Sequence, residues 1–170
     1  MTVQTVVTGL AWMGIGVRSV KSALKDILRN AEHEVLLCAY SVTGGADTIL
    51  EELEDCLKRG IQFKAVINRF NKQPPEIQNY LLNLVKVYPY CELYDFNDLV
   101  EELHSKLIVV DRSVALVGSA NLSMRGMKQN YELGIIIRGE EVGTISKCFD
   151  SLLTLPTVLP LISNGEDKLI

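Results

Sequence analysis

The sequence predicts an α/β fold in which a mixed β-sheet is flanked by helices on both faces. Through the first half of the chain, short apolar runs alternate with segments of helical periodicity, which is typical of this class. Further along, two β-branched runs separated by three residues predict an antiparallel hairpin. The 170 residues suit a single domain with its own core, which we expect over residues 1–155, followed by an irregular C-terminal tail at 156–170.

The elements of the first half follow from local patterns. Apolar runs bounded by polar residues predict strands at 3–8, 34–40, 61–67 and 91–94. Apolar residues at helical spacing predict a helix over 19–30, and Asp47 and Gly60 can cap and end a second helix over 47–59. Pro74 and Pro75 open a third helix that reaches about residue 87.

The elements of the second half are shorter. Residues 107–110 and 114–117 predict the two strands of the hairpin, with the turn at 111–113. Residues 121–127 predict one or two helical turns, 133–137 a strand and 141–153 a final helix.

The N-terminal segment 3–17 is apolar, but it is shorter than the roughly 18 to 20 residues that a membrane span needs. We expect a buried strand followed by a turn at Gly14 and Gly16, with an interfacial anchor as the alternative. A membrane is therefore not the expected partner.

Charge excludes one common signature of nucleic-acid binding. The net charge is −4 and the pI about 5.2, so the whole protein has no basic field. Residues 104–138 nevertheless contain five bases and two acids, a local balance of +3. A basic patch on an acidic body remains open, and Arg125 and Lys128 are candidate substrate-binding residues.

No metal or cofactor is expected. The four cysteines form no Cys-x-x-Cys pair and lie at no metal-ligand spacing from a histidine, so structural free thiols in a reducing, cytoplasmic setting are predicted. Acidic clusters at 47–55 and 95–102 could bind a metal or share protons, but a solvated surface is the expected role of both.

The residues with chemical potential lie in one segment. His104 and Lys106 are two apart at the start of a strand, so both side chains point to the same face. An imidazole beside a fixed ammonium is unfavourable when both are charged, but it suits catalysis if an anion binds between them. Gly118, Ser119 and Asn121 follow where the next strand ends, and there a hydroxyl, an amide and backbone N–H groups can converge on phosphate oxygens.

Glu132 completes the set as a candidate acceptor for a histidine N–H. The inventory of imidazole, ammonium, hydroxyl, amide and carboxylate contains no cluster of hard oxygen ligands. It favours phosphoryl transfer through a covalent phosphohistidine.

Six of these positions match the HKD motif of the phospholipase D superfamily, which the sequence resembles over about residues 19–153. The motif positions are His104, Lys106, Asp111, Gly118, Ser119 and Asn121. The resemblance implies a phospholipase D-like fold, catalytic roles for His104, Lys106, Ser119, Asn121 and Glu132, and structural roles for Asp111 and Gly118.

The chain holds one such motif, whereas superfamily catalysis uses two that face each other. It therefore resembles the single-motif bacterial endonuclease, the restriction nucleases and the mitochondrial phospholipase-like nuclease, which form homodimers. The resemblance implies that His104 of one subunit attacks phosphorus while His104 of the other acts as acid and then base. Lys106 and Asn121 would hold the non-bridging oxygens, Ser119 would assist, and Glu132 would orient an imidazole.

The sequence leaves the substrate open. A metal-independent nuclease acting on DNA or RNA is the main interpretation. A weak resemblance of the opening strand to proteins of bacterial anti-phage and restriction systems suggests defence, with partner proteins that could deliver the substrate. The alternatives are a phospholipase or phosphatidyltransferase acting on phospholipid headgroups, and an inactive nucleic-acid-binding relative.

Overall fold

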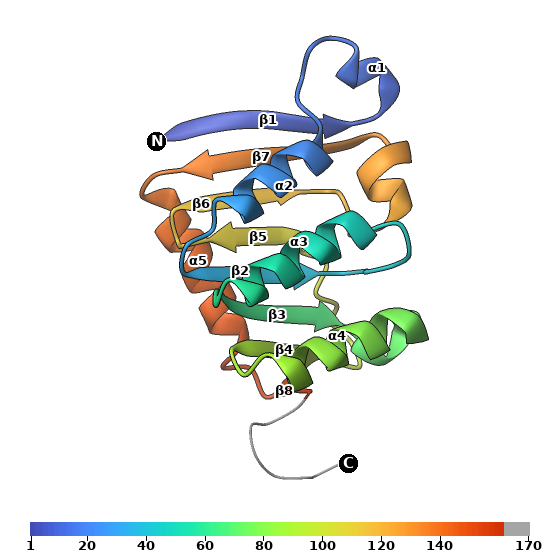
Figure 1. The fold of residues 1–170 in the computed structure, drawn as a ribbon, viewed down its shortest axis with the longest axis vertical. Coiled ribbons are helices and arrows are strands. Elements are labelled where there is room, and N and C mark those ends of the chain that lie inside the picture. Colours follow the sequence, from blue (N-terminus) through green and yellow to red (C-terminus); the bar gives the residue numbers. More distant parts are fainter. Residues whose placement is uncertain (162–170) are drawn as a thin grey trace.

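The computed structural model describes residues 1–161, which form one mixed eight-stranded sheet with helices on both faces (Figure 1). The strand order is β1-β7-β6-β5-β2-β3-β4-β8. Helices α2, α3 and α4 cover one face, and α5 covers the other (Figure 1). The elements in chain order are β1 (Thr2–Thr8), α1 (Leu10–Met13), α2 (Val20–Arg29), β2 (Glu34–Ala39), α3 (Asp47–Lys58), β3 (Gln62–Asn68), η1 (Phe70–Lys72), α4 (Pro75–Val87), β4 (Cys91–Phe96), β5 (Leu107–Val110), β6 (Val114–Gly118), η2 (Arg125–Gln129), β7 (Glu132–Arg138), α5 (Glu141–Leu152) and β8 (Val158–Pro160).

The predicted mixed sheet and the helices on both faces are confirmed. Strands β2, β3 and β4 are parallel, because a helix connects each to the next, whereas β5, β6 and β7 form an antiparallel meander. Strand β5 pairs antiparallel with β2 and joins the two halves. Each face has its own apolar core: α2 and α3 contribute to one, while Val142 and Phe149 of α5 contribute to the other.

Local signals explain where the longer helices begin and end. The hydroxyl of Ser19 accepts a hydrogen bond from Ser22 N (3.1 Å) and caps α2, as the predicted start at residue 19 requires. Asp47, expected to cap α3, is instead its first helical residue, and the preceding Ala46 offers no side-chain cap. Asp47 therefore acts through its charge at the positive end of the helix.

Four expectations were wrong at the ends of the chain and in one loop. β1 is an edge strand that is exposed over its first four residues rather than buried, and a short helix, α1, precedes the glycine turn. Residues 158–160 of the expected irregular tail form β8, which pairs with β4 at the other edge. The rest of that tail, 162–170, lies outside the described residues. The turns expected at 121–127 occur later, as a π-helix over Arg125–Gln129.

Candidate active site

The predicted catalytic residues gather at one end of the sheet. The end of β2, the segment leading into β5, the end of β6 and the start of β7 all lie at this end, because β5 and β7 run antiparallel to β2 and β6. Helix α1 lies at the same end, since it follows β1, whose last residue Thr8 pairs with Glu132 (Figure 1).

His104 and Lys106 meet as the sequence predicts. Lys106 Nζ lies 2.9 Å from His104 Nδ1 and donates a hydrogen bond to the carbonyl oxygen of His104 at 2.7 Å. The imidazole is exposed, whereas the lysine stem is partly buried. Burial lowers the pKa of Lys106 below its ordinary value, and the negative charge of Glu132 opposes this effect. A phosphate oxygen entering here would meet both the ring and the ammonium.

Tyr40 is a site residue that the sequence did not reveal. Its ring packs against the His104 imidazole, with centroids 4.4 Å apart and the planes tilted by 51°. Lys106 Nζ lies 4.9 Å from the centroid of the same ring, in cation–π range. In the sequence Tyr40 ends a buried strand. The antiparallel register, in which Cys38 pairs with Leu107, brings it beside His104.

Within the described chain Ser119 and Glu132 form a pair, and the expected role of Glu132 in orienting an imidazole stays a prediction. The hydroxyl of Ser119 donates a short hydrogen bond to the Glu132 carboxylate, and Asn130 Nδ2 donates to the other oxygen at 3.1 Å. Within the described chain the carboxylate therefore orients Ser119, and no hydrogen bond joins it to His104. The reason is register: Glu132 starts β7, next to the end of β6, whereas β5 lies one strand further away.

Gly118 allows this close approach. A Cβ at Gly118 would lie 2.7 Å from the carbonyl oxygen of Leu133 and 2.8 Å from Gly134 Cα. Any larger residue would push β6 and β7 apart, and the Ser119–Glu132 pair would separate with them.

Asn121 lines a small cavity together with Tyr40 and Lys106. Its Oδ1 is buried and has no hydrogen-bond partner among residues 1–161, an uncommon state for a buried amide. The backbone of η2 passes close to that of Asn121, and the following residue is hydrogen-bonded to the loop after β2. A Cβ at Gly126 of η2 would lie 2.3 Å from the Asn121 carbonyl oxygen, and Thr43 N donates to the next carbonyl, that of Leu122, at 2.9 Å.

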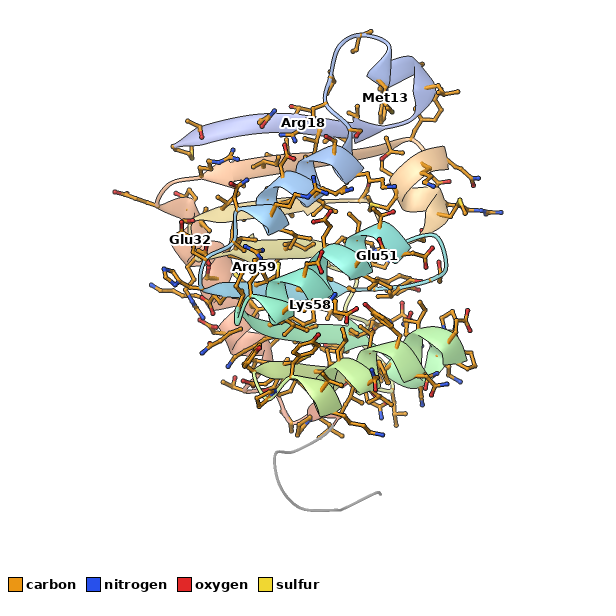
Figure 2. The ribbon with its side chains drawn as sticks, viewed as in Figure 1. Met13, Arg18, Glu32, Glu51, Lys58 and Arg59 are labelled. Carbon is orange, nitrogen blue, oxygen red and sulfur yellow. The ribbon has the colours of Figure 1, made fainter. Side chains whose placement is uncertain are left out.

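Asp111 lies far from these residues, at the opposite end of the sheet. Its carboxylate accepts hydrogen bonds from the backbone N–H groups of Glu32 (2.9 Å), His33 (2.7 Å) and Glu34 (2.9 Å). Figure 2 shows Glu32 at the end of the molecule away from Met13 of α1. Asp111 thus joins the β5–β6 turn to the start of β2, and it contacts no group of the candidate site.

Arg125 and Lys128 are exposed on η2, beside the Asn121 segment. Their side chains are available to a ligand at this end of the sheet, but the structure gives them no contact with His104 or Lys106. Next to η2, the exposed rings of Trp12 and Tyr131 pack edge to face, with centroids 5.1 Å apart.

Three further observations concern groups that could bind a metal or a membrane. Within residues 1–161, no three His, Cys, Asp or Glu side chains come together as a group that could hold a metal ion. All four cysteines are free, and burial raises the pKa of Cys38 and of Cys91 to about 12. No helix in the described part of the chain is long and apolar enough to cross a membrane.

Known proteins are similar to this chain over most of its length. Residues 24–153 match the family described as "Cardiolipin synthase, PLD-like domain". The DISARM protein DrmC of Bacillus paralicheniformis is 25% identical over 149 residues, which cover 83% of this chain and 59% of that protein. Phospholipase D Y of Dictyostelium discoideum is 30% identical over 135 residues, 71% of this chain but only 30% of its own length.

A solved structure shares the fold over nearly its whole extent. The phospholipase D family member Nuc of Salmonella typhimurium superposes with a TM-score of 0.76 at 21% identity, covering 95% of this chain and 99% of Nuc. Because the family match spans well over half of the chain and the fold agrees, the chain belongs to the phospholipase D superfamily of phosphodiesterases.

Proposed function

We propose that the protein is a metal-independent nuclease that cleaves phosphodiesters of DNA or RNA through a covalent phosphohistidine on His104. The observation that carries this proposal is the contact between the His104 ring and the Lys106 ammonium at the sheet end where Ser119, Glu132 and Asn121 also lie. These groups supply a nucleophile and cationic and neutral donors for a phosphate, with a single carboxylate and not a cluster of hard oxygen ligands.

The reaction would proceed in two steps, formation of the phosphohistidine and its hydrolysis. A ring nitrogen of one His104 attacks phosphorus, the bond from phosphorus to the leaving oxygen breaks, and a second imidazolium donates its proton to that oxygen. Water then attacks the phosphohistidine, its proton passes to the second imidazole, and the phosphorus–nitrogen bond breaks. Lys106 Nζ and Asn121 Nδ2 donate to the non-bridging oxygens, since both residues line the same cavity.

The second imidazole, we propose, comes from a second copy of the chain. The sequence contains two histidines, His33 and His104. His33 precedes β2 and Tyr40 follows it, so His33 is separated from the site by the length of that strand, roughly 23 Å at the usual rise per residue. His33 cannot reach the phosphate held at His104. A twofold axis passing near His104 would supply the missing group.

Nucleic acid is the proposed substrate for two reasons. Arg125 and Lys128 are exposed next to the site on a chain of net charge −4, so cationic side chains are available where a polyanion would bind. The segment 104–138, which carries the site residues, also has a local charge balance of +3 on an otherwise acidic chain.

We extend the proposal to a cytoplasmic role in bacterial anti-phage defence, with partner proteins that deliver the nucleic acid. This role is supported by the resemblance of the opening strand to proteins of bacterial anti-phage and restriction systems. It is also supported by the similarity to a DISARM protein over 83% of this chain.

Phospholipid hydrolysis or headgroup transfer is the second candidate, and one feature favours it. Leu10 and Ile15, in and just after α1, are 87% and 74% exposed at the same end of the sheet as His104. Apolar side chains beside an active site suit an enzyme that works at a lipid surface.

A cleavage assay in EDTA separates the two. Purified protein is incubated with 1 mM EDTA and either plasmid, single-stranded DNA, RNA or phosphatidylglycerol vesicles, with His104→Ala as the matched control. Cleavage of nucleic acid that survives EDTA and is lost in His104→Ala supports the proposal. Turnover of lipid alone refutes the nuclease, and activity that EDTA abolishes refutes the metal-independent mechanism.

A mixing experiment tests the homodimer. Wild-type and His104→Ala chains with different tags are co-expressed in equal amounts and purified as a mixture. If each site needs two His104 rings, only wild-type pairs are active, and specific activity falls to about one quarter of the wild-type value. A fall to about one half would mean that each chain acts alone.

A further inference from the structure

Two buried amide side chains lie directly beneath the candidate site. Gln73, which follows η1, is 7% exposed, and Asn68, the last residue of β3, is 4% exposed. Polar side chains this deeply buried require hydrogen-bond partners, and those of Gln73 and Asn68 lie in the segments that carry Tyr40 and His104.

Gln73 fixes the backbone on both sides of Ser41. Its Oε1 accepts from Val42 N at 2.9 Å, and its Nε2 lies 3.3 Å from the carbonyl oxygen of Tyr40 and donates to that of Asn68 at 2.8 Å. The amide therefore holds the chain where β2 ends, which is where the Tyr40 ring leaves the backbone to pack on His104.

Asn68 fixes the backbone next to the histidine itself. Its Oδ1 accepts a hydrogen bond from Leu103 N at 2.9 Å, and Leu103 directly precedes His104. The segment that carries both amides is anchored in turn by Asp95 of β4, whose buried carboxylate accepts from Phe70 N at 2.7 Å.

We propose that Gln73 and Asn68 are positioning residues of the site, which together set the packing of the Tyr40 ring on the His104 imidazole. One amide holds the backbone of the tyrosine and the other the backbone before the histidine, and the two amides are joined through the Asn68 carbonyl. The consequence for catalysis rests on the proposed role of His104 as nucleophile. The effect of the two amides on the packing of the Tyr40 and His104 rings does not depend on that role.

The physical reason is that, within the described chain, the Tyr40 hydroxyl makes no hydrogen bond and the ring nitrogens of His104 contact only the Lys106 ammonium. His104 is exposed, and its contacts are the Tyr40 face and a flexible lysine. A shift of about 1 Å in a reacting group can cost about a hundredfold in rate, so the backbone beneath the two rings must be rigid. Buried amides that are hydrogen-bonded to the backbone provide such rigidity.

The test compares four variants with the wild type, and a fifth, Tyr40→Leu, serves to assign the NMR signal. Gln73→Met keeps the volume but removes all three contacts, and Asn68→Ala removes the acceptor for Leu103 N, whereas Asn68→Asp retains an oxygen there. Arg59→Met is the matched control. Arg59 donates to the carbonyl oxygens of Leu28 (2.7 Å) and Ala31 (2.8 Å), so its loss also removes side-chain hydrogen bonds to backbone carbonyls. Figure 2 shows Arg59 at the end of the helices away from Met13 and the site.

The first readout is the imidazole Cε1–H signal of His104 in proton NMR, which the ring current of Tyr40 should displace from that of exposed His33. Tyr40→Leu removes the tyrosine ring, so the loss of the displacement in this variant assigns it to the Tyr40 ring current. In Gln73→Met and Asn68→Ala the displacement should shrink, whereas in Arg59→Met it should stay. Unchanged displacement in both amide variants would overturn the proposal, whether or not the protein proves to be a nuclease.

The second readout is hydrolysis of bis(p-nitrophenyl) phosphate at a temperature where each variant is folded by circular dichroism. We expect kcat to fall about 10- to 100-fold in the two amide variants with KM changed less than about threefold, and to recover in Asn68→Asp. An equal loss in Arg59→Met would refute positioning, because general destabilisation would then explain it. Inactive wild-type protein would refute the proposed function and leave the NMR result to decide this inference.

Discussion

Asp111 belongs to the HKD motif, yet its replacement should impair stability and not chemistry. Its backbone is in the left-handed region, with φ of 51°, and its carboxylate accepts three backbone N–H groups, those of Glu32, His33 and Glu34. Asp111→Ala removes all three acceptors and leaves a residue with a Cβ but no local hydrogen bond in a conformation that favours Gly, Asn and Asp.

The magnitude follows from these contacts. A hydrogen bond contributes about 1 kcal/mol net, so three give about 3 kcal/mol, and the left-handed backbone adds about 1 kcal/mol for alanine. Water can replace part of this, since Glu32 and His33 are exposed, and we expect a loss of about 3 kcal/mol in the free energy of unfolding. For a chain of this size, that lowers Tm by roughly 6–12 °C.

The assay is urea unfolding followed by circular dichroism, with Asp111→Asn as the matched variant. Asparagine tolerates the left-handed backbone and retains one carbonyl oxygen, so it should lose less than half as much stability as alanine. Phosphodiesterase activity per folded molecule at 15 °C should remain within about threefold of wild type in both. Inactive but stably folded Asp111→Ala would refute the reasoning and place Asp111 in the catalytic machinery.

Three further predictions concern other parts of the molecule. His104→Ala should abolish phosphodiester cleavage with Tm unchanged within about 2 °C, because the ring is exposed; residual turnover above about 1% would contradict its role as nucleophile. Gly126→Ala should lower kcat/KM roughly tenfold or more, because its Cβ would lie 2.3 Å from the Asn121 carbonyl oxygen; wild-type kinetics would show that η2 does not position this residue. Glu52→Gln should destabilise the protein at pH 7 by about 1–3 kcal/mol, because the buried carboxylate accepts from Arg29 Nη2 at 2.6 Å and lies near Lys25. The hydrogen bond from Arg29 lowers the pKa of Glu52, so its contribution is complete above the unfolded-state pKa and is lost as pH falls through the folded-state value; equal effects of the substitution at pH 7 and pH 3 would contradict this.

Much of the fold could be predicted because its signals are local. The strand and helix boundaries followed from apolar periodicity and from capping residues such as Ser19, and most agree with the structure to within two residues. The failures have two causes, the shortness of two elements and the strand order of the sheet. Helix α1 has four residues and β8 three, too few for any period to emerge. Strand β1 is exposed over four residues because it lies at the sheet edge, and edge position depends on strand order.

The candidate site also has a part that could be predicted from the sequence and a part that could not. His104, Lys106, Ser119 and Asn121 could be grouped from the sequence because a single hairpin carries them, and the close spacing of a hairpin leaves few arrangements in space. The chemistry of their side chains could be inferred from residue type alone.

Only the tertiary structure decided which other groups meet His104. Tyr40 reaches it through the pairing of β2 with β5, and Gln73 and Asn68 lie beneath it because the segment after β3 folds against both. The partner of Glu132 was also decided by register, since β7 pairs with β6 and not with β5. Residue type and spacing along the chain determine what a local motif can do, whereas contacts between distant segments depend on strand order, which the packing of the whole core selects.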